Sequence, residues 1–98
     1  MMAEKILFKL LTPLKEVASY SCDAVSLFEK DNAHGQGGSL GVRPGHLPAV
    51  IALEDSSQVR AAAKGNTVFS ATVRGGFARV DGQSVTVLTP EAEVTLET

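Results

Sequence analysis

The stretch Phe77-Ala78-Arg79-Val80-Asp81-Gly82-Gln83-Ser84-Val85-Thr86-Val87-Leu88 carries the strongest fold signal in this sequence. Polar and β-branched residues alternate from Ser84 to Val87, and a period of two is typical of a strand with one buried face. An Asp-Gly pair separates this segment from residues 77–80, and it tolerates the positive φ angles of a type I′ turn. We therefore expect an antiparallel hairpin that turns at Asp81-Gly82.

Other segments of the chain alternate in the same way. Ile6, Phe8 and Leu10 lie on one side of a segment whose lysines face the other side. Residues 23–29 and 67–73 also show this period. Short segments of this kind, separated by closely spaced turn signals, favour an all-β sandwich or barrel.

Residues 58–64 give conflicting signals. The run Ala61-Ala62-Ala63 has high helix propensity, because alanine is the best helix former. A segment this short is not stable as an isolated helix. Gly65-Asn66 also connects it to residues 67–73, with glycine first as a type II′ hairpin turn requires. We predict a strand here, in a second hairpin.

The composition indicates one compact domain. The chain has 98 residues, of which 44% are hydrophobic, and it contains nine glycines and four prolines. This length suffices for one hydrophobic core, and so much glycine and proline leaves little room for long helices. We expect a single domain over residues 1–98, with its core at about 5–88 and a short tail at 89–98.

Charge, cysteine content and apolar runs exclude several classes of protein. A net charge of −2 lacks the basic character of a nucleic-acid-binding protein. The single cysteine, Cys22, cannot form an internal disulfide, which excludes a disulfide-stapled secreted scaffold. Ala49-Val50-Ile51-Ala52-Leu53, the longest apolar run, is about a quarter of a transmembrane helix, and residues 1–5 show no secretory signal. We expect a soluble cytoplasmic protein.

No residue pattern predicts a metal site. His34 and His46 are the only two histidines, and Asp31 and Cys22 are the nearest further candidate ligands. Neither a C-x-x-C nor an H-x-x-x-H spacing occurs, so we expect surface histidines and no bound metal. Cys22 lies in a strand-like segment, where we expect a small buried hydrophobe.

The glycine-rich stretch Gly35-Gln36-Gly37-Gly38-Ser39-Leu40-Gly41 does not predict a nucleotide site either. The dinucleotide fingerprint needs glycine at the position of Leu40, and the P-loop needs Gly-Lys-Ser/Thr, which is missing. No helical pattern follows whose N-terminus could bind a phosphate. We expect no nucleotide, no cofactor and no catalytic residue.

The following residues form a stiffened, partly apolar loop. A tight Gly-x-x-Gly segment, 38–41, leads into a turn at Pro44-Gly45, which presents His46 and Leu47 before a further proline. Such a loop suits a docking surface, because pre-organisation lowers the ordering cost of binding. It equally suits a corner between two sheets, where glycine and proline serve only the geometry. Both interpretations stay open on these residues alone.

Three blocks of the sequence resemble the N-terminal β-sandwich domain of the epsilon subunit of F-type ATP synthases, called delta in mitochondria. Gly38-Ser39-Leu40-Gly41-Val42-Arg43-Pro44-Gly45-His46-Leu47-Pro48 is similar to the family pattern G-x-L-G-[IV]-x-P-G-H-x-P. Gly75-Gly76-Phe77 with Ser84-Val85-Thr86-Val87-Leu88 resembles a second block, and Leu10-Leu11-Thr12-Pro13 resembles the end of the first strand. The resemblance covers about residues 8–88.

This resemblance implies a flattened two-sheet sandwich of about ten short strands that acts as a non-catalytic rotor subunit of the central stalk. It implies docking on the gamma subunit and the c-ring, with the alpha/beta hexamer reached indirectly, so that ion translocation is coupled to ATP synthesis or hydrolysis. It also implies a place on the cytoplasmic face of the bacterial membrane without insertion into it. The residues expected to face the c-ring are Ser39, Leu40, Gly41, Arg43, Pro44, Gly45 and His46, and those expected to face gamma are Leu10, Leu11 and Thr12.

Family members usually continue after this domain into two helices that regulate hydrolysis and sometimes bind ATP. Only ten residues follow Leu88, too few for two helices, and Pro90 with Val94-Thr95-Leu96 favours an extended chain. We expect no C-terminal helical hairpin. Two alternatives remain: a free-standing β-sandwich module that binds a ligand or peptide, and a small metalloenzyme using both histidines and a carboxylate.

Overall fold

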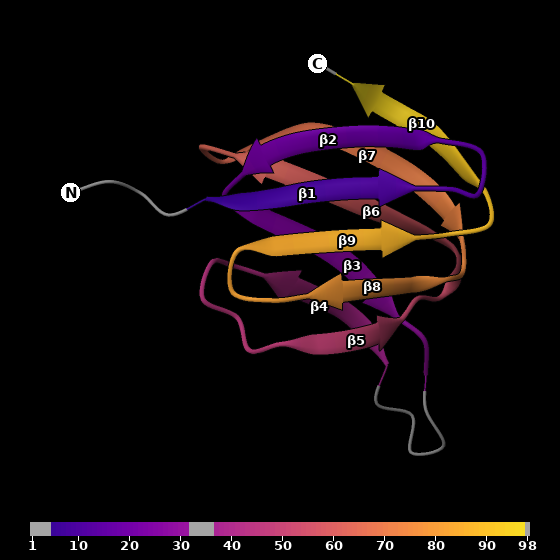
Figure 1. Cartoon of the computed structure of the whole chain (residues 1–98), viewed down its shortest axis with the longest axis horizontal. Helices are drawn as coiled ribbons and strands as arrows, with labels where there is room; N and C mark the ends of the chain where they lie inside the picture. The colour runs from indigo at the N-terminus through magenta and orange to yellow at the C-terminus, as the bar shows by residue number, and fades with distance from the viewer. Residues whose placement is uncertain (1–4, 32–36, 98) are drawn as a thin grey trace.

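The computed structural model describes residues 5–31 and 37–97, which form ten strands and no helix (Figure 1). The strands are β1 (Ile6–Leu11), β2 (Glu16–Cys22), β3 (Ala24–Glu29), β4 (Gly38–Val42), β5 (Ala49–Ala52), β6 (Asp55–Ala63), β7 (Asn66–Arg74), β8 (Phe77–Val80), β9 (Ser84–Leu88) and β10 (Ala92–Glu97). A helix with the length and apolar character to span a bilayer does not occur in these residues.

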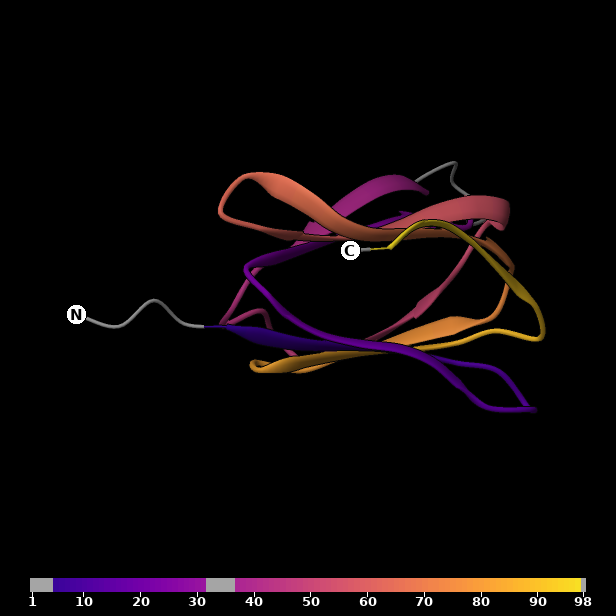
Figure 2. The ribbon, with the colours of Figure 1, turned by 90° about the horizontal axis from the view of Figure 1, so that it is seen from above.

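The strands form two five-stranded sheets that are stacked face to face (Figure 2). Sheet A has the order β2-β1-β9-β8-β5, and sheet B has the order β10-β7-β6-β3-β4. Neighbouring strands are antiparallel except for β1 and β9, which pair in parallel. The prediction of an all-β, two-sheet sandwich of about ten strands is confirmed.

The core lies between the sheets and is built from the alternating inward positions. Ile6, Phe8 and Leu10 are buried, as their period of two predicted. The ring of Phe69 from sheet B packs 5.8 Å from that of Phe8 and 5.3 Å from that of Tyr20, centroid to centroid. Aromatic and β-branched side chains from both sheets thus fill one continuous interior.

The hairpin of β8 and β9 is confirmed, but its predicted turn type is wrong. Neither Asp81 nor Gly82 has the positive φ that a type I′ turn needs. The turn is centred on Gly82-Gln83, and the N–H of Asp81 donates to the carbonyl oxygen of Ser84 at 3.0 Å. Asp81 Oδ1 accepts the N–H groups of Gln83 and Ser84, both at 2.8 Å. This side-chain bonding stabilises a different turn, as aspartate at a turn start often does.

Residues 58–63 are a strand, as predicted, but the turn after them also differs in type. The central residues are Lys64 and Gly65, with φ angles of 54° and 80°, and Ala63 pairs with Asn66. Positive φ at both positions is the pattern of a type I′ turn, not of the predicted type II′ turn at Gly65-Asn66. Asp23 Oδ2 accepts the N–H of Lys64 at 2.6 Å, which helps hold lysine in this conformation.

Two further segments differ from expectation because each forms a strand of sheet B. The expected tight segment at 38–41 is part of β4, an edge strand of sheet B that pairs with β3. Residues 89–98 are not simply a tail, because β10 pairs with β7 and extends sheet B. The extended conformation expected around Val94 is confirmed.

Candidate docking surfaces

The residues considered as metal ligands are not brought together in the part of the chain that the structure describes. Residues 5–31 and 37–97 hold no group of three histidine, cysteine, aspartate or glutamate side chains that could bind a metal. His34 lies outside the described residues, as do Gly35 and Gln36 of the glycine-rich stretch. His46 Nδ1 lies 2.8 Å from the carbonyl oxygen of Leu47, a local contact within its own loop.

Cys22 is a structural residue of the hydrophobic core. Its side chain is fully buried, with Sγ 3.6 Å from the carbonyl oxygen of Ile6, and burial raises the pKa of the thiol. A thiol with a raised pKa is a poor nucleophile. The prediction of a small buried hydrophobe is confirmed.

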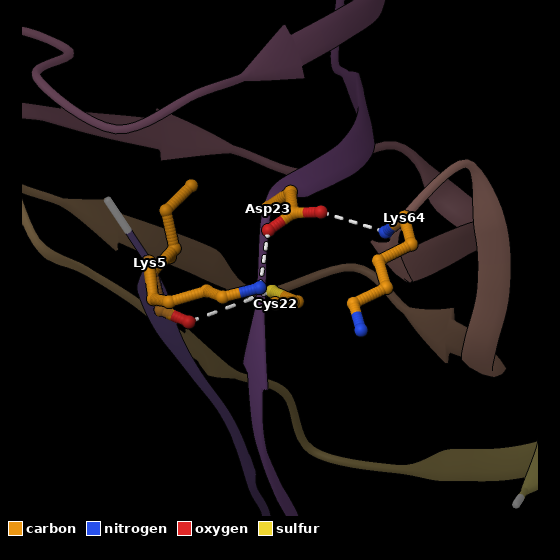
Figure 3. Close-up of polar contacts among 5 residues, drawn as sticks. Lys5, Cys22, Asp23 and Lys64 are labelled. Atoms are coloured by element: carbon orange, nitrogen blue, oxygen red, sulfur yellow. Dashed lines mark hydrogen bonds and ion pairs between the residues drawn. The ribbon is translucent and has the colours of Figure 1, made fainter. Parts of the chain in front are cut away.

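The neighbouring residue, Asp23, ties three segments together (Figure 3). Lys5 Nζ lies 2.7 Å from Asp23 Oδ1, and the N–H of Lys64 donates to Oδ2. These hydrogen bonds, the one from Lys5 first, lower the pKa of the Asp23 carboxyl. The cluster thus links the start of β1, the β2–β3 connection and the β6–β7 turn, which is a stabilising role.

The Pro44-Gly45 turn is present as predicted. The N–H of His46 donates to the carbonyl oxygen of Arg43 at 3.2 Å, and Gly45 has a φ of 86°, as the third residue of a type II turn requires. The N–H of Gly45 donates to the carbonyl oxygen of Gly82 at 2.8 Å, so this turn is joined to the β8–β9 turn at one end of the sandwich (Figure 1). A cleft of about 560 Å³ lies beside it, lined by Lys5, Leu7, Ser21, Gly45, Gly82 and Gln83.

The structure divides the residues expected to face the c-ring into two groups. Arg43, Pro44, Gly45 and His46 form the turn at the end of the sandwich, whereas Ser39, Leu40 and Gly41 lie along β4. The first and last of these three are exposed, and Leu40 packs partly buried against the core.

Two strongly exposed apolar side chains lie near the Pro44-Gly45 turn. Leu47 is 80% exposed just after it, in the loop that the sequence indicated, and Val50 on β5 is 71% exposed. Val50 was not predicted; it faces outward beside Arg79, whereas its neighbour Ile51 on the same strand is buried.

The opposite end of sheet A carries an exposed apolar patch, defined here as Leu11, Pro13, Phe77, Leu88 and Pro90. These residues line a groove of about 440 Å³ together with Thr12, Gly76 and Thr89. Phe77 is 56% exposed and Leu88 is 49% exposed, although both are large apolar side chains. Exposed apolar patches with a polar surround often mark protein interaction sites.

Strand pairing brings this patch together from three strands. Leu11 on β1 lies beside Leu88 on β9, and Leu88 lies beside Phe77 on β8. All three point outward, because their neighbours along each strand, such as Leu10, face the core.

The structure corrects one of the residues expected to face gamma. Leu10 is fully buried in the core, so its side chain does not belong to a docking surface. Leu11 and Thr12 line the groove. Phe77 and Leu88 were missed, although the alternation of the hairpin places both on the outward face, where a polar residue is usual.

Comparison with known proteins gives a consistent result. Residues 5–95 match the sequence model of a family described as ATP synthase, Delta/Epsilon chain, beta-sandwich domain. The ATP synthase epsilon chain of Syntrophobacter fumaroxidans is 38% identical over 92 residues, which are 94% of this chain and 63% of that protein. That of Rhodobacter capsulatus is 34% identical over 87 residues, 89% of this chain and 60% of its own length. The chain thus spans less than two thirds of these relatives.

Solved structures share the fold. A chain of the Euglena gracilis mitochondrial ATP synthase, in a cryo-EM structure with OSCP, F1 and the c-ring, superposes with a TM-score of 0.74 at 22% identity. The match covers 96% of this chain and 56% of that one. A chain of the Tetrahymena thermophila mitochondrial ATP synthase central stalk and c-ring gives a TM-score of 0.65 at 14% identity, covering 94% and 68% of the two chains.

Proposed function

Because the chain belongs to the ATP synthase delta/epsilon chain family through its β-sandwich domain, we propose that it is a non-catalytic subunit in the central stalk of an F-type ATP synthase. In this role it docks on the gamma subunit and the c-ring and turns with them. It couples ion translocation to ATP synthesis or hydrolysis and reaches the alpha/beta hexamer only indirectly. Its place is on the cytoplasmic face of the bacterial cell membrane, without insertion.

One observation carries this proposal: the sandwich has two separate surfaces suited to docking, one at each end of sheet A. The apolar patch around Phe77 and Leu88 lies at one end, and the Pro44-Gly45 turn lies at the other (Figure 1). An adaptor that joins two partners needs two such surfaces held at a constant distance by a rigid body. A ten-stranded sandwich with one continuous core provides that rigidity.

We assign the apolar patch to gamma. Its centre is apolar and pre-formed on three paired strands, and Thr12 supplies a polar group in the same groove. A protein interface of this type has an apolar centre and a polar rim and needs no catalytic group. Leu11, expected to face gamma, belongs to this patch, and Thr12 lines the same groove.

We assign the Pro44-Gly45 turn to the c-ring. The Gly45 N–H donates a hydrogen bond to the β8–β9 turn, so the conformation of the Pro44-Gly45 turn is largely set before binding. His46 and the exposed Leu47 follow it directly. Ser39 lies on the outer face of sheet B, paired with Phe28, and contributes to the c-ring contact only if that contact also covers the β4 edge.

Binding to purified cognate gamma subunit tests the first assignment. We expect micromolar or tighter binding, and we expect Phe77→Ala to weaken it about tenfold or more, as for a central aromatic anchor. Phe28→Ala is the matched control, because Phe28 is also exposed, at 41%, but on the outer face of sheet B. Absence of binding by the unaltered chain at micromolar concentration would refute the proposal.

Assembly with the gamma subunit and the c-ring tests the second assignment. We expect His46→Ala and Leu47→Ala to weaken retention of the gamma–chain complex on c-ring-containing vesicles while leaving binding to free gamma unchanged. A variant that weakened both steps equally would show that the two ends are not separate docking surfaces.

A further inference from the structure

The outer face of sheet A carries positive charge in the row next to the apolar patch. Strand pairing places Lys9 on β1, Thr86 on β9 and Arg79 on β8 side by side in one outward row, called here the cationic row. Arg79 is exposed and Lys9 is partly exposed. This charge contrasts with the net charge of −2 of the whole chain.

The carboxylates around the cationic row leave its charge largely uncompensated. Glu16 Oε1 lies 4.0 Å from Lys9 Nζ, a long contact between two half-exposed side chains that contributes little. Within residues 5–31 and 37–97, no carboxylate forms an ion pair with Arg79. The pKa of Asp81 is lowered mainly by hydrogen bonds from Gln83 and Ser84 at the turn, and the charge of Arg79 contributes to this shift without forming an ion pair.

The spacing of this face can be derived from sheet geometry. Lys9 and Arg79 lie on strands separated by β9, so their backbones are about 10 Å apart at a strand spacing near 4.8 Å. The apolar row of Leu11, Leu88 and Phe77 lies two residues along the same strands, about 7 Å away. A partner that covers the apolar row therefore also approaches the two cations.

From this juxtaposition we infer that the gamma surface that covers the apolar patch carries carboxylates opposite Lys9 and Arg79. The inference rests on the proposed function and adds the chemistry of the partner. Complementary charge at the rim of an interface accelerates encounter and selects orientation more than it adds affinity. The apolar row thus holds the complex together, and the cationic row steers its formation.

The association rate with immobilised gamma at several salt concentrations tests the inference. We expect Arg79→Glu to slow association by about fivefold to tenfold at 50 mM salt, with a much smaller change in the dissociation rate. The difference in association rate between Arg79→Glu and the unaltered chain should shrink at 0.5 M salt, where charges more than about 4–5 Å apart are screened. Phe77→Ala should have the opposite effect on the two rates: the dissociation rate should rise, and the association rate should change little.

Arg60→Glu is the matched control. Arg60 is an exposed arginine on the outer face of sheet B, and its replacement changes the net charge by the same amount. We expect it to change the association rate less than twofold. If Arg60→Glu and Arg79→Glu slowed association equally, the effect would come from net charge alone, and the inference would be overturned. Faster association of Arg79→Glu, or association independent of salt, would overturn it as well.

Carbodiimide cross-linking gives a second measurement, because it joins lysines to carboxylates in direct contact. In the gamma complex we expect Lys9 linked to a gamma carboxylate, and no such link for Lys64 at the β6–β7 turn. Binding to gamma without a Lys9 link and without a salt effect would refute the acidic partner surface but leave the proposed function intact. Absence of any binding would instead refute the proposed function.

Discussion

Gly76 offers the sharpest test of how backbone geometry supports the apolar patch. It has a φ of 102°, and a Cβ at this position would overlap the carbonyl oxygen of Leu88 and lie 2.9 Å from the Cα of Thr89. Both contacts are backbone, which cannot rotate away as a side chain can. Gly76→Ala should therefore be destabilising for two reasons: the backbone conformation disfavours any L side chain, and there is no room for one.

The expected loss in unfolding free energy of Gly76→Ala is the sum of these two effects. A non-glycine residue held in such a backbone region costs about 1–3 kcal/mol. Forcing an extra methyl group into a packed site costs about 1–3 kcal/mol more. The sum, about 2–6 kcal/mol, is a large share of the roughly 5–15 kcal/mol of unfolding free energy of a typical domain.

Two other glycines separate the two effects. Gly65 has a φ of 80°, but a Cβ added there would meet nothing within 4 Å, so Gly65→Ala should show only the conformational cost. Gly82 has neither a positive φ nor a close neighbour, so Gly82→Ala should stay within about 1 kcal/mol of the unaltered chain.

Urea denaturation followed by far-UV circular dichroism measures the free energy of unfolding of all three variants. The expected order of destabilisation is Gly76→Ala, then Gly65→Ala, then Gly82→Ala. If Gly76→Ala cost no more than Gly65→Ala, the close approach of the 76 and 88–89 backbones would be wrong, and with it the geometry of the groove.

Three further predictions concern single side chains. The pKa of Asp23 is lowered, so its stabilising effect is present above the ordinary aspartate pKa of about 3.9 and is lost as the pH falls through the lower folded value; Asp23→Asn should reduce the difference in urea midpoint between about pH 6 and pH 2.5, and an unchanged difference would contradict the cluster. The buried Cys22 thiol should react with iodoacetamide slowly at pH 8 and much faster in urea; equal rates in both conditions would show an open site. His46→Ala should change the melting temperature by only a few degrees, because the side chain makes a local contact in its own loop; a loss as large as that of Gly76→Ala would make His46 a structural residue.

The fold was largely predictable from the sequence because burial in a sheet follows a local period of two. Ile6, Phe8 and Leu10 face the core as their alternation indicated, and residues 58–63 form a strand despite three consecutive alanines. The positions of the hairpins followed from glycine, asparagine and aspartate between alternating segments. Their turn types did not, because they depend on hydrogen bonds that compete with intrinsic preference.

The candidate docking surfaces were only partly predictable. The Pro44-Gly45 turn was identifiable because its conformation is encoded by adjacent residues. The apolar patch was not, because Leu11 and Phe77 become neighbours only through Leu88 and the parallel pairing of β1 with β9. The period of two in residues 6–11 does distinguish Leu10, which is fully buried, from Leu11, which lines the groove, so the expectation that both face gamma conflicts with that period.

Local sequence specified which residues alternate, where the chain turns and hence that the fold is all-β, since these depend on contacts within a few residues. The packing of the whole chain determined which strands and which side chains are neighbours. It produced the Lys64-Gly65 turn, where the carboxylate of Asp23 reaches across 41 residues to accept a backbone N–H. It also joined Leu11, Leu88 and Phe77 into one exposed row. Strand order is chosen by the packing of the whole core, so no local pattern contains it.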